Sequence, residues 1–142
     1  MSLWDRIKDI FGFGSEPTWT HPNDVECPSR YRDMLRECYW EAAAKLEKIG
    51  VDRRHKVVEF KVRKGEVLRP GGWAVPHKGS PTGYAGGYAT EKTITLICNP
   101  TTGDVVRASM CHEWAEAILQ AKKKYKMMTI AERHAVITRA GI

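Results

Sequence analysis

The chain has 142 residues, of which 42% are hydrophobic and 28% are charged. These values are typical of one soluble globular domain and exclude a largely disordered or low-complexity chain. Lysine and arginine number 23 against 17 acidic residues, a basic balance that favours anionic partners without naming one. No stretch approaches the roughly 18 consecutive apolar residues that a membrane-spanning helix requires, so we expect no membrane span.

The first residues predict a short amphipathic helix that is detached from the body of the protein. Over residues 2–11, one helical face collects the apolar side chains of Leu3, Trp4, Ile7, Ile10 and Phe11. The stretch "GFGSEPTWTHPND" that follows carries two glycines and two prolines, as linkers do. We therefore expect an N-terminal helix (1–12), a linker (13–27) and a single domain (28–142). The start lacks the pattern of a secretory signal and the cysteines form no C-x-x-C pair, which favours a cytoplasmic protein with free thiols.

The first half of the domain predicts one helix and two strands. Apolar residues recur every three or four positions from Tyr31 to Ile49, and Gly50 ends the pattern, which predicts a helix over 28–50. Val58 and Val62 alternate with basic residues, as in a half-buried strand over 56–63. A turn at residues 64 and 65 then leads to a second strand over 66–69.

Residues 70–91 form a segment with six glycines and three prolines among 22 positions, so a helix is excluded there. Its aromatic residues Trp73, Tyr84 and Tyr88 fit either short extended pieces around a binding groove or a long irregular loop. Within it His77 has two readings, a ligand or oxyanion donor that reaches a cleft and an exposed loop histidine, and we favour the second. The next residues, "TITLIC" (93–98), are β-rich and almost continuously apolar, which predicts a strand.

The last 40 residues predict two helices. Asp104 suits the cap of a long helix that runs to about Tyr125, and Thr129 with Glu132 suits a capping box for a final helix that Gly141 closes. The order of elements predicts an α+β fold. It consists of a small mixed or antiparallel sheet with a leading helix, a long helix and a closing C-terminal helix.

The long helix carries "HEWAE", which begins like the zinc-binding motif H-E-x-x-H but has Glu116 in the fifth position. His112 and Glu116 are four residues apart and project from one helical face. Zinc accepts imidazole nitrogen and carboxylate oxygen alike, so this change of ligand does not forbid a site. The third ligand has two candidates on the final helix. The capping box already accounts for Glu132, which leaves His134.

The sequence thus predicts a zinc site made of His112, Glu116 and His134. The alternative is structural, because glutamates at 113 and 116 are also common on the solvated face of a surface helix.

In "HEWAE", in the strand before it and in the order of its elements, the chain resembles the zincin metallopeptidases, especially the small gluzincins. The resemblance implies that His112 is a zinc ligand and Glu113 the general base. It also implies that "TITLIC", with Ile94 and Leu96, is the edge strand beside a substrate cleft. The glycine-rich segment with Trp73, Tyr84 and Tyr88 would then line the approach to this cleft. The departure from the family is Glu116, which stands where a histidine is expected.

Two functions follow as expectations. The first is a zinc-dependent hydrolase that acts on peptide bonds of a peptide or protein substrate. The second is a non-catalytic binding or assembly module on the same scaffold, with the N-terminal helix as its attachment to a protein partner. Such a module would suit a phage or mobile-element particle, and the protein would then be virion-associated. The basic clusters show no aromatic interleaving or helix-turn-helix pattern, so nucleic acid is not favoured as a partner.

Overall fold

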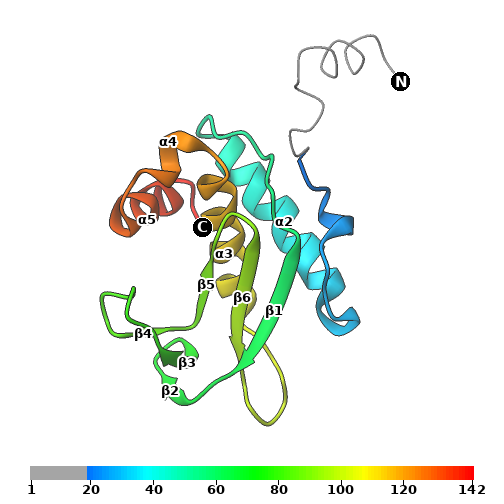
Figure 1. The fold of residues 1–142 in the computed structure, drawn as a ribbon, viewed down its shortest axis with the longest axis vertical. Coiled ribbons are helices and arrows are strands. Elements are labelled where there is room, and N and C mark those ends of the chain that lie inside the picture. Colours follow the sequence, from blue (N-terminus) through cyan, green and yellow to red (C-terminus); the bar gives the residue numbers. More distant parts are fainter. Residues whose placement is uncertain (1–18) are drawn as a thin grey trace.

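The computed structural model describes residues 19–142, so the expected N-terminal helix lies outside the described part (Figure 1). Within it the fold is α+β, as predicted. The α-helices are α2 (Arg32–Glu47), α3 (Arg107–Gln120), α4 (Lys123–Lys126) and α5 (Ile130–Arg139). Two short 3-10 helices, Pro22–Asp24 and Ser29–Tyr31, precede them. None of the helices that residues 19–142 form is long and apolar enough to cross a membrane.

Residues 19–142 contain six short strands, which form two sheets of three strands each. The strands are β1 (Glu59–Lys64), β2 (Val67–Arg69), β3 (Gly72–Pro76), β4 (Tyr84–Ala85), β5 (Gly87–Ala89) and β6 (Thr93–Cys98). One sheet has the order β1-β6-β5, and β6 runs parallel to β1 and antiparallel to β5. The other is the antiparallel sheet β2-β3-β4. The glycine-rich segment therefore folds into short extended pieces, the first of the two readings that its composition allowed.

The "TITLIC" strand is β6, and the expectation that it forms a sheet edge is wrong. β6 is the central strand of its sheet, and residues 94–98 are all buried. A nearly continuous apolar run suits such a position because both faces of the strand are covered. The edge strand next to it is β5, from the glycine-rich segment.

Helix α3 occupies the centre of the molecule, packed against α2, α5 and the strands β5 and β6 (Figure 1). Every residue from 110 to 119 except His112 is buried, so α3 is a core helix rather than an amphipathic surface helix. Trp114 is fully buried, and its Nε1 donates a hydrogen bond to the Leu35 carbonyl oxygen at 3.0 Å. The helix that carries the "HEWAE" motif is thus fixed by its surroundings on most sides.

The ends of the last helices differ in part from the prediction. Asp104 does not cap α3, which begins at Arg107, because its carboxylate pairs with Arg30 at 2.6 Å. The helix also ends earlier than expected, at Gln120, and the short α4 follows. The capping box at the start of α5 is confirmed, since Thr129 Oγ1 accepts from the Glu132 N–H at 3.1 Å and the Glu132 carboxylate accepts from the Thr129 N–H at 3.0 Å.

The body of the protein begins before residue 28, so the linker expected over 13–27 is wrong for residues 19–27. Val25 is only 1% exposed and belongs to the core. Glu26 forms a parallel bridge with Glu59, and the Thr20 N–H donates to the His55 carbonyl at 2.9 Å. Pro22, one of the two prolines that suggested a linker, lies in a 3-10 helix and is itself buried.

His55 is a fully buried histidine that the sequence did not single out. Its ring packs against Tyr39 and Trp114, with centroid distances of 5.0 and 4.8 Å. Its Nδ1 accepts a hydrogen bond from the Val57 N–H at 3.1 Å, so the neutral ring carries its proton on Nε2. Burial, with smaller contributions from the charges of Lys122 and His21, lowers the pKa of His55 to about 4.

This pKa predicts a loss of stability in mild acid. Between pH 6.5, the usual pKa of histidine, and about pH 4, the His55 ring is protonated in the unfolded chain but stays neutral in the folded chain. His55 should therefore lower the free energy of unfolding by about 3 kcal/mol as the pH falls from 7 to 4. Urea titrations at several pH values measure this, with His55→Phe as the control that lacks the titrating ring. Equal pH slopes for both proteins would contradict the prediction.

Candidate metal centre

The three ligands predicted from the sequence lie together in the structure. His112 and Glu116 project from successive turns of α3, and His134 comes from α5. The two Nε2 atoms of the histidines are 3.3 Å apart, and His134 Nε2 lies 3.8 Å from Glu116 Oε2. One nitrogen or oxygen atom from each residue falls within 4.8 Å of the other two. Although the His134 side chain is 46% exposed, this residue of α5 and one turn of α3 converge on one point.

These distances fit a zinc ion. Two ligand atoms that each lie about 2.0–2.1 Å from a tetrahedral zinc are roughly 3.3 Å from one another. The separation between the two imidazole nitrogens already has this value. The carboxylate oxygen needs only a small movement to join them, because helices α3 and α5 are already packed against each other.

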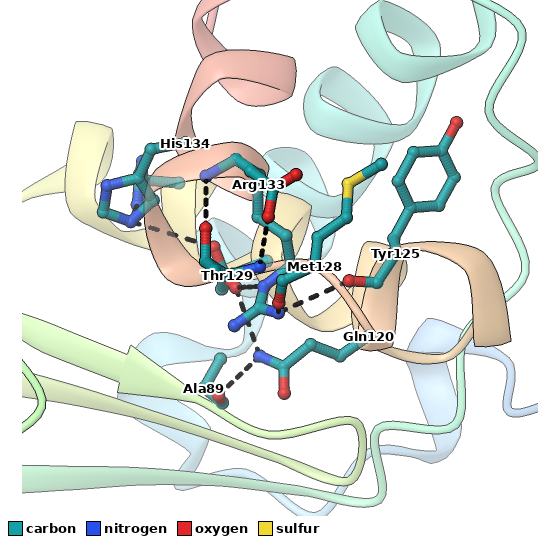
Figure 2. Close-up of polar contacts among 10 residues, drawn as sticks. Ala89, Gln120, Tyr125, Met128, Thr129, Arg133 and His134 are labelled. Atoms are coloured by element: carbon teal, nitrogen blue, oxygen red, sulfur yellow. Dashed lines mark hydrogen bonds and ion pairs between the residues drawn. The ribbon is translucent and has the colours of Figure 1, made fainter.

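The Glu116 carboxylate supplies the strongest sign of a missing partner. Its Oε1 accepts from Arg133 Nε and, at 3.3 Å, from Gln120 Nε2. The Gln120 amide is fixed in turn by the Ala89 carbonyl at 2.8 Å (Figure 2). The other oxygen, Oε2, is buried and has no hydrogen-bond partner among the described residues. An unpartnered buried carboxylate oxygen is costly, and a cation between it and the two imidazoles would satisfy it.

Arg133 is an element of the site that sequence reasoning missed. The side chain is buried beside Glu116, and its Nη1 donates to the carbonyl oxygens of Met128 at 2.6 Å and Tyr125 at 3.4 Å (Figure 2). Arg133 thus holds Glu116 in one orientation, as residues behind metal ligands do, and offsets its charge. Gln120 was also missed as a part of the site, although its position four residues after Glu116 was a signal in the sequence.

The structural alternative for the two glutamates of "HEWAE" is wrong in this fold. Glu113 is 7% exposed and Glu116 is 6% exposed, so neither lies on a solvated helix face. Burial, followed by the negative charge of Glu116, raises the pKa of Glu113 to about 8. Burial and the charge of His134 lower the pKa of His112. A lowered pKa favours the neutral imidazole, which is the form that binds a metal.

A cavity of about 480 Å³ opens onto the three ligands and Glu113. The glycine-rich segment lines its other side, including Tyr84, Tyr88 and the small residues of β5. His77 also lines this cavity, with its ring centroid 4.9 Å from that of Tyr88, so the interpretation as an exposed loop histidine is wrong. The fold of the glycine-rich segment brings His77 to the site, and no local sequence pattern indicates this contact.

Three of the expected substrate-binding residues lie elsewhere. Ile94 and Leu96 are fully buried in the core and line no part of the cavity, because β6 is central and β5 covers it. Trp73 is absent from this cavity and lines a neighbouring one. Tyr84 and Tyr88 are placed as expected.

Gly87 lets β5 lie close to α3 at the point where Glu113 faces the cavity. A Cβ atom at this position would lie 2.8 Å from Leu96 Cδ2, 3.1 Å from the Thr95 carbonyl oxygen and 3.2 Å from Glu113 Cγ. Gly87→Ala should therefore push β5 outward and lower the free energy of unfolding by about 1–3 kcal/mol. Chemical denaturation measures this loss.

The neighbouring glycine provides a matched control. A Cβ atom on Gly86 would meet its nearest neighbour, the Trp73 carbonyl oxygen, at an ordinary 3.6 Å. Gly86→Ala should therefore change stability much less than Gly87→Ala. Equal losses of stability in the two variants would contradict this explanation. They would show that the close approach of β5 to Glu113 is not the reason why Gly87 is a glycine.

Comparison of the chain with protein-family models, with curated proteins and with solved structures gives no match. We therefore infer the function from the geometry of this site.

Proposed function

We propose that the protein is a zinc-dependent hydrolase of peptide bonds. The proposal rests on one observation: the side chains of His112, Glu116 and His134 lie together on the wall of a cavity that Glu113 also lines. Two histidines and one carboxylate are a known ligand set of catalytic zinc sites, which leave one coordination position open. A zinc ion held there would polarise a substrate carbonyl group and lower the pKa of water.

Glu113 is the general base in this proposal. It follows His112 on α3, faces the same cavity and is shielded from bulk solvent. Its carboxylate would accept a proton from the attacking water and pass it to the nitrogen of the departing amine. In the protein without a metal, the raised pKa keeps Glu113 largely protonated at pH 7. A cation on the adjacent ligands would favour its carboxylate form.

The cavity wall formed by β5, which lies against Glu113, suits an extended peptide. β5 pairs with β6 along one side only, and the small residues Gly86, Gly87 and Ala89 line the cavity there. We assign to β5 the role beside the substrate that the resemblance had implied for β6. An edge strand offers backbone donors and acceptors to an added strand, which binds a peptide largely independently of its side chains.

Arg133 compensates for the charge of Glu116, which stands where the usual motif has a second histidine. A carboxylate in the place of the second histidine adds negative charge at the metal and weakens its Lewis acidity. The guanidinium group of Arg133, hydrogen-bonded to Glu116 Oε1, withdraws part of this charge. The pair Glu116–Arg133 is therefore closer to a neutral ligand than a free carboxylate would be.

The same ion pair favours the second candidate, a non-catalytic binding or assembly module. Arg133 neutralises Glu116 even without a metal, so the buried carboxylate is tolerated in a protein that binds none. In that case chelators would leave the stability of the protein unchanged, and no peptide would be cleaved.

A cleavage assay separates these candidates. The protein, purified without a histidine tag and loaded with zinc, is incubated with a mixture of unstructured peptides, and the products are identified by mass spectrometry. We expect cleavage that a chelator abolishes and added zinc restores. Intact peptides in the presence of fully zinc-loaded protein would contradict the proposed hydrolase and favour the non-catalytic module.

A further inference from the structure

A second cavity, of about 330 Å³, adjoins the one that holds the candidate metal centre. The two cavities share Tyr84, Gly86 and Ser109 as wall residues, so a ligand in one lies directly beside the other. The remaining walls of the second cavity come from the β2–β3 turn, from Trp73 and from Val106. A peptide bound along β5 would therefore have neighbouring groups within reach of this space.

The lining of the second cavity carries one positive charge, on Arg69, and no aspartate or glutamate. Among residues 19–142, no carboxylate forms a salt bridge with Arg69. Arg69 as a whole residue is half-buried. A partly desolvated arginine without an anionic partner favours an anion in the adjoining space.

The fold holds this guanidinium in place. Arg69 pairs with Gly72 in the β2–β3 ladder, and its Cζ lies 4.4 Å from the centroid of the Tyr84 ring. Stacking on an aromatic ring engages the face of a guanidinium and leaves the N–H groups on its edge free. These donors form a fork that matches the two oxygens of a carboxylate. Ser109 lines the same cavity and carries a further hydroxyl donor, whereas the Thr82 hydroxyl already donates to the Tyr84 carbonyl oxygen at 3.1 Å.

We infer that the second cavity is a subsite for a carboxylate group of the substrate, bound by Arg69. The inference rests on the proposed function, since it assigns specificity to the same cleft. The carboxylate is either an acidic side chain near the scissile bond or the C-terminus of the peptide. Arg69 is a specificity residue in this scheme.

Binding to the chelator-treated protein tests the inference without any need for turnover. The probes are fluorescent hexapeptides in matched pairs. One set has glutamate or glutamine at each position in turn with an amidated C-terminus, and the other has a free or an amidated C-terminus with no acidic side chain. We expect the carboxylate member of at least one pair to bind roughly tenfold to hundredfold more tightly. The set in which the preference occurs identifies the source of the carboxylate.

The preference should disappear in Arg69→Gln, persist in part in Arg69→Lys and be unchanged in Arg36→Gln, an exposed arginine of α2 that lines neither cavity. Equal binding within every pair, absence of binding, or a preference that survives in Arg69→Gln would overturn the inference. If the binding preference depends on Arg69 but the zinc-loaded protein cleaves no peptide, the result contradicts the proposed hydrolase and supports the carboxylate subsite. Zinc-dependent cleavage without such a preference would support the hydrolase and contradict the carboxylate subsite.

Discussion

Replacing Glu113 with glutamine is expected to lower kcat for peptide hydrolysis by about 10²- to 10⁴-fold while one zinc ion stays bound, the range that general acid–base catalysis contributes. Glutamine has nearly the same shape and fits the tight space beside Gly87, but its amide accepts no proton from water. The experiment measures kcat and zinc content on the same preparations of the wild type and the variant.

Glu132→Gln is the matched control, because Glu132 lies on α5 outside both cavities and glutamine also completes a capping box. Its kcat should equal that of the wild type. If Glu113→Gln keeps both its zinc and its full hydrolytic rate, Glu113 is not the base.

Removing either imidazole should lower the affinity for zinc by at least about a hundredfold, since even the loss of a group that merely supports a ligand costs about 10- to 100-fold. Each variant leaves only two ligands, which are too few to close a zinc site: Glu116 and His134 remain in His112→Ala, and His112 and Glu116, both on α3, remain in His134→Ala. Competition with a chromophoric chelator measures the dissociation constants.

His77→Ala is the control for these two variants. His77 lines the same cavity but does not belong to the group of three ligands, so its removal should leave the zinc affinity unchanged. Equal losses in all three variants would indicate unspecific binding by histidines. An unchanged affinity in His134→Ala would show that α5 contributes no ligand.

The parts of the fold that the sequence predicted well depend on local patterns. The helix after residue 28 and the capping box of α5 arise from side chains a few positions apart, and both are present. The start of α3 was misplaced because Asp104 is engaged by Arg30, 74 residues away, a contact without any local signature. β6 was misplaced as an edge through the resemblance, although its nearly continuous apolar run already indicated burial on both faces.

The candidate site follows the same rule. His112 and Glu116 share a helical face by geometry alone, and His134 was reached because the capping box already accounted for Glu132, the other candidate on the last helix. The contributions of Arg133 and His77 depend on how α5 and the glycine-rich segment lie against α3 in three dimensions. No spacing along the chain encodes such contacts, so these two residues had to be found in the structure.

Zinc analysis combined with X-ray absorption on protein purified without a histidine tag tests the metal centre most directly. We expect one zinc ion per chain, bound only by nitrogen and oxygen atoms at about 2.0–2.2 Å. Protein that takes up no zinc from a buffered excess, or zinc with sulfur ligands at about 2.3 Å, would contradict this expectation.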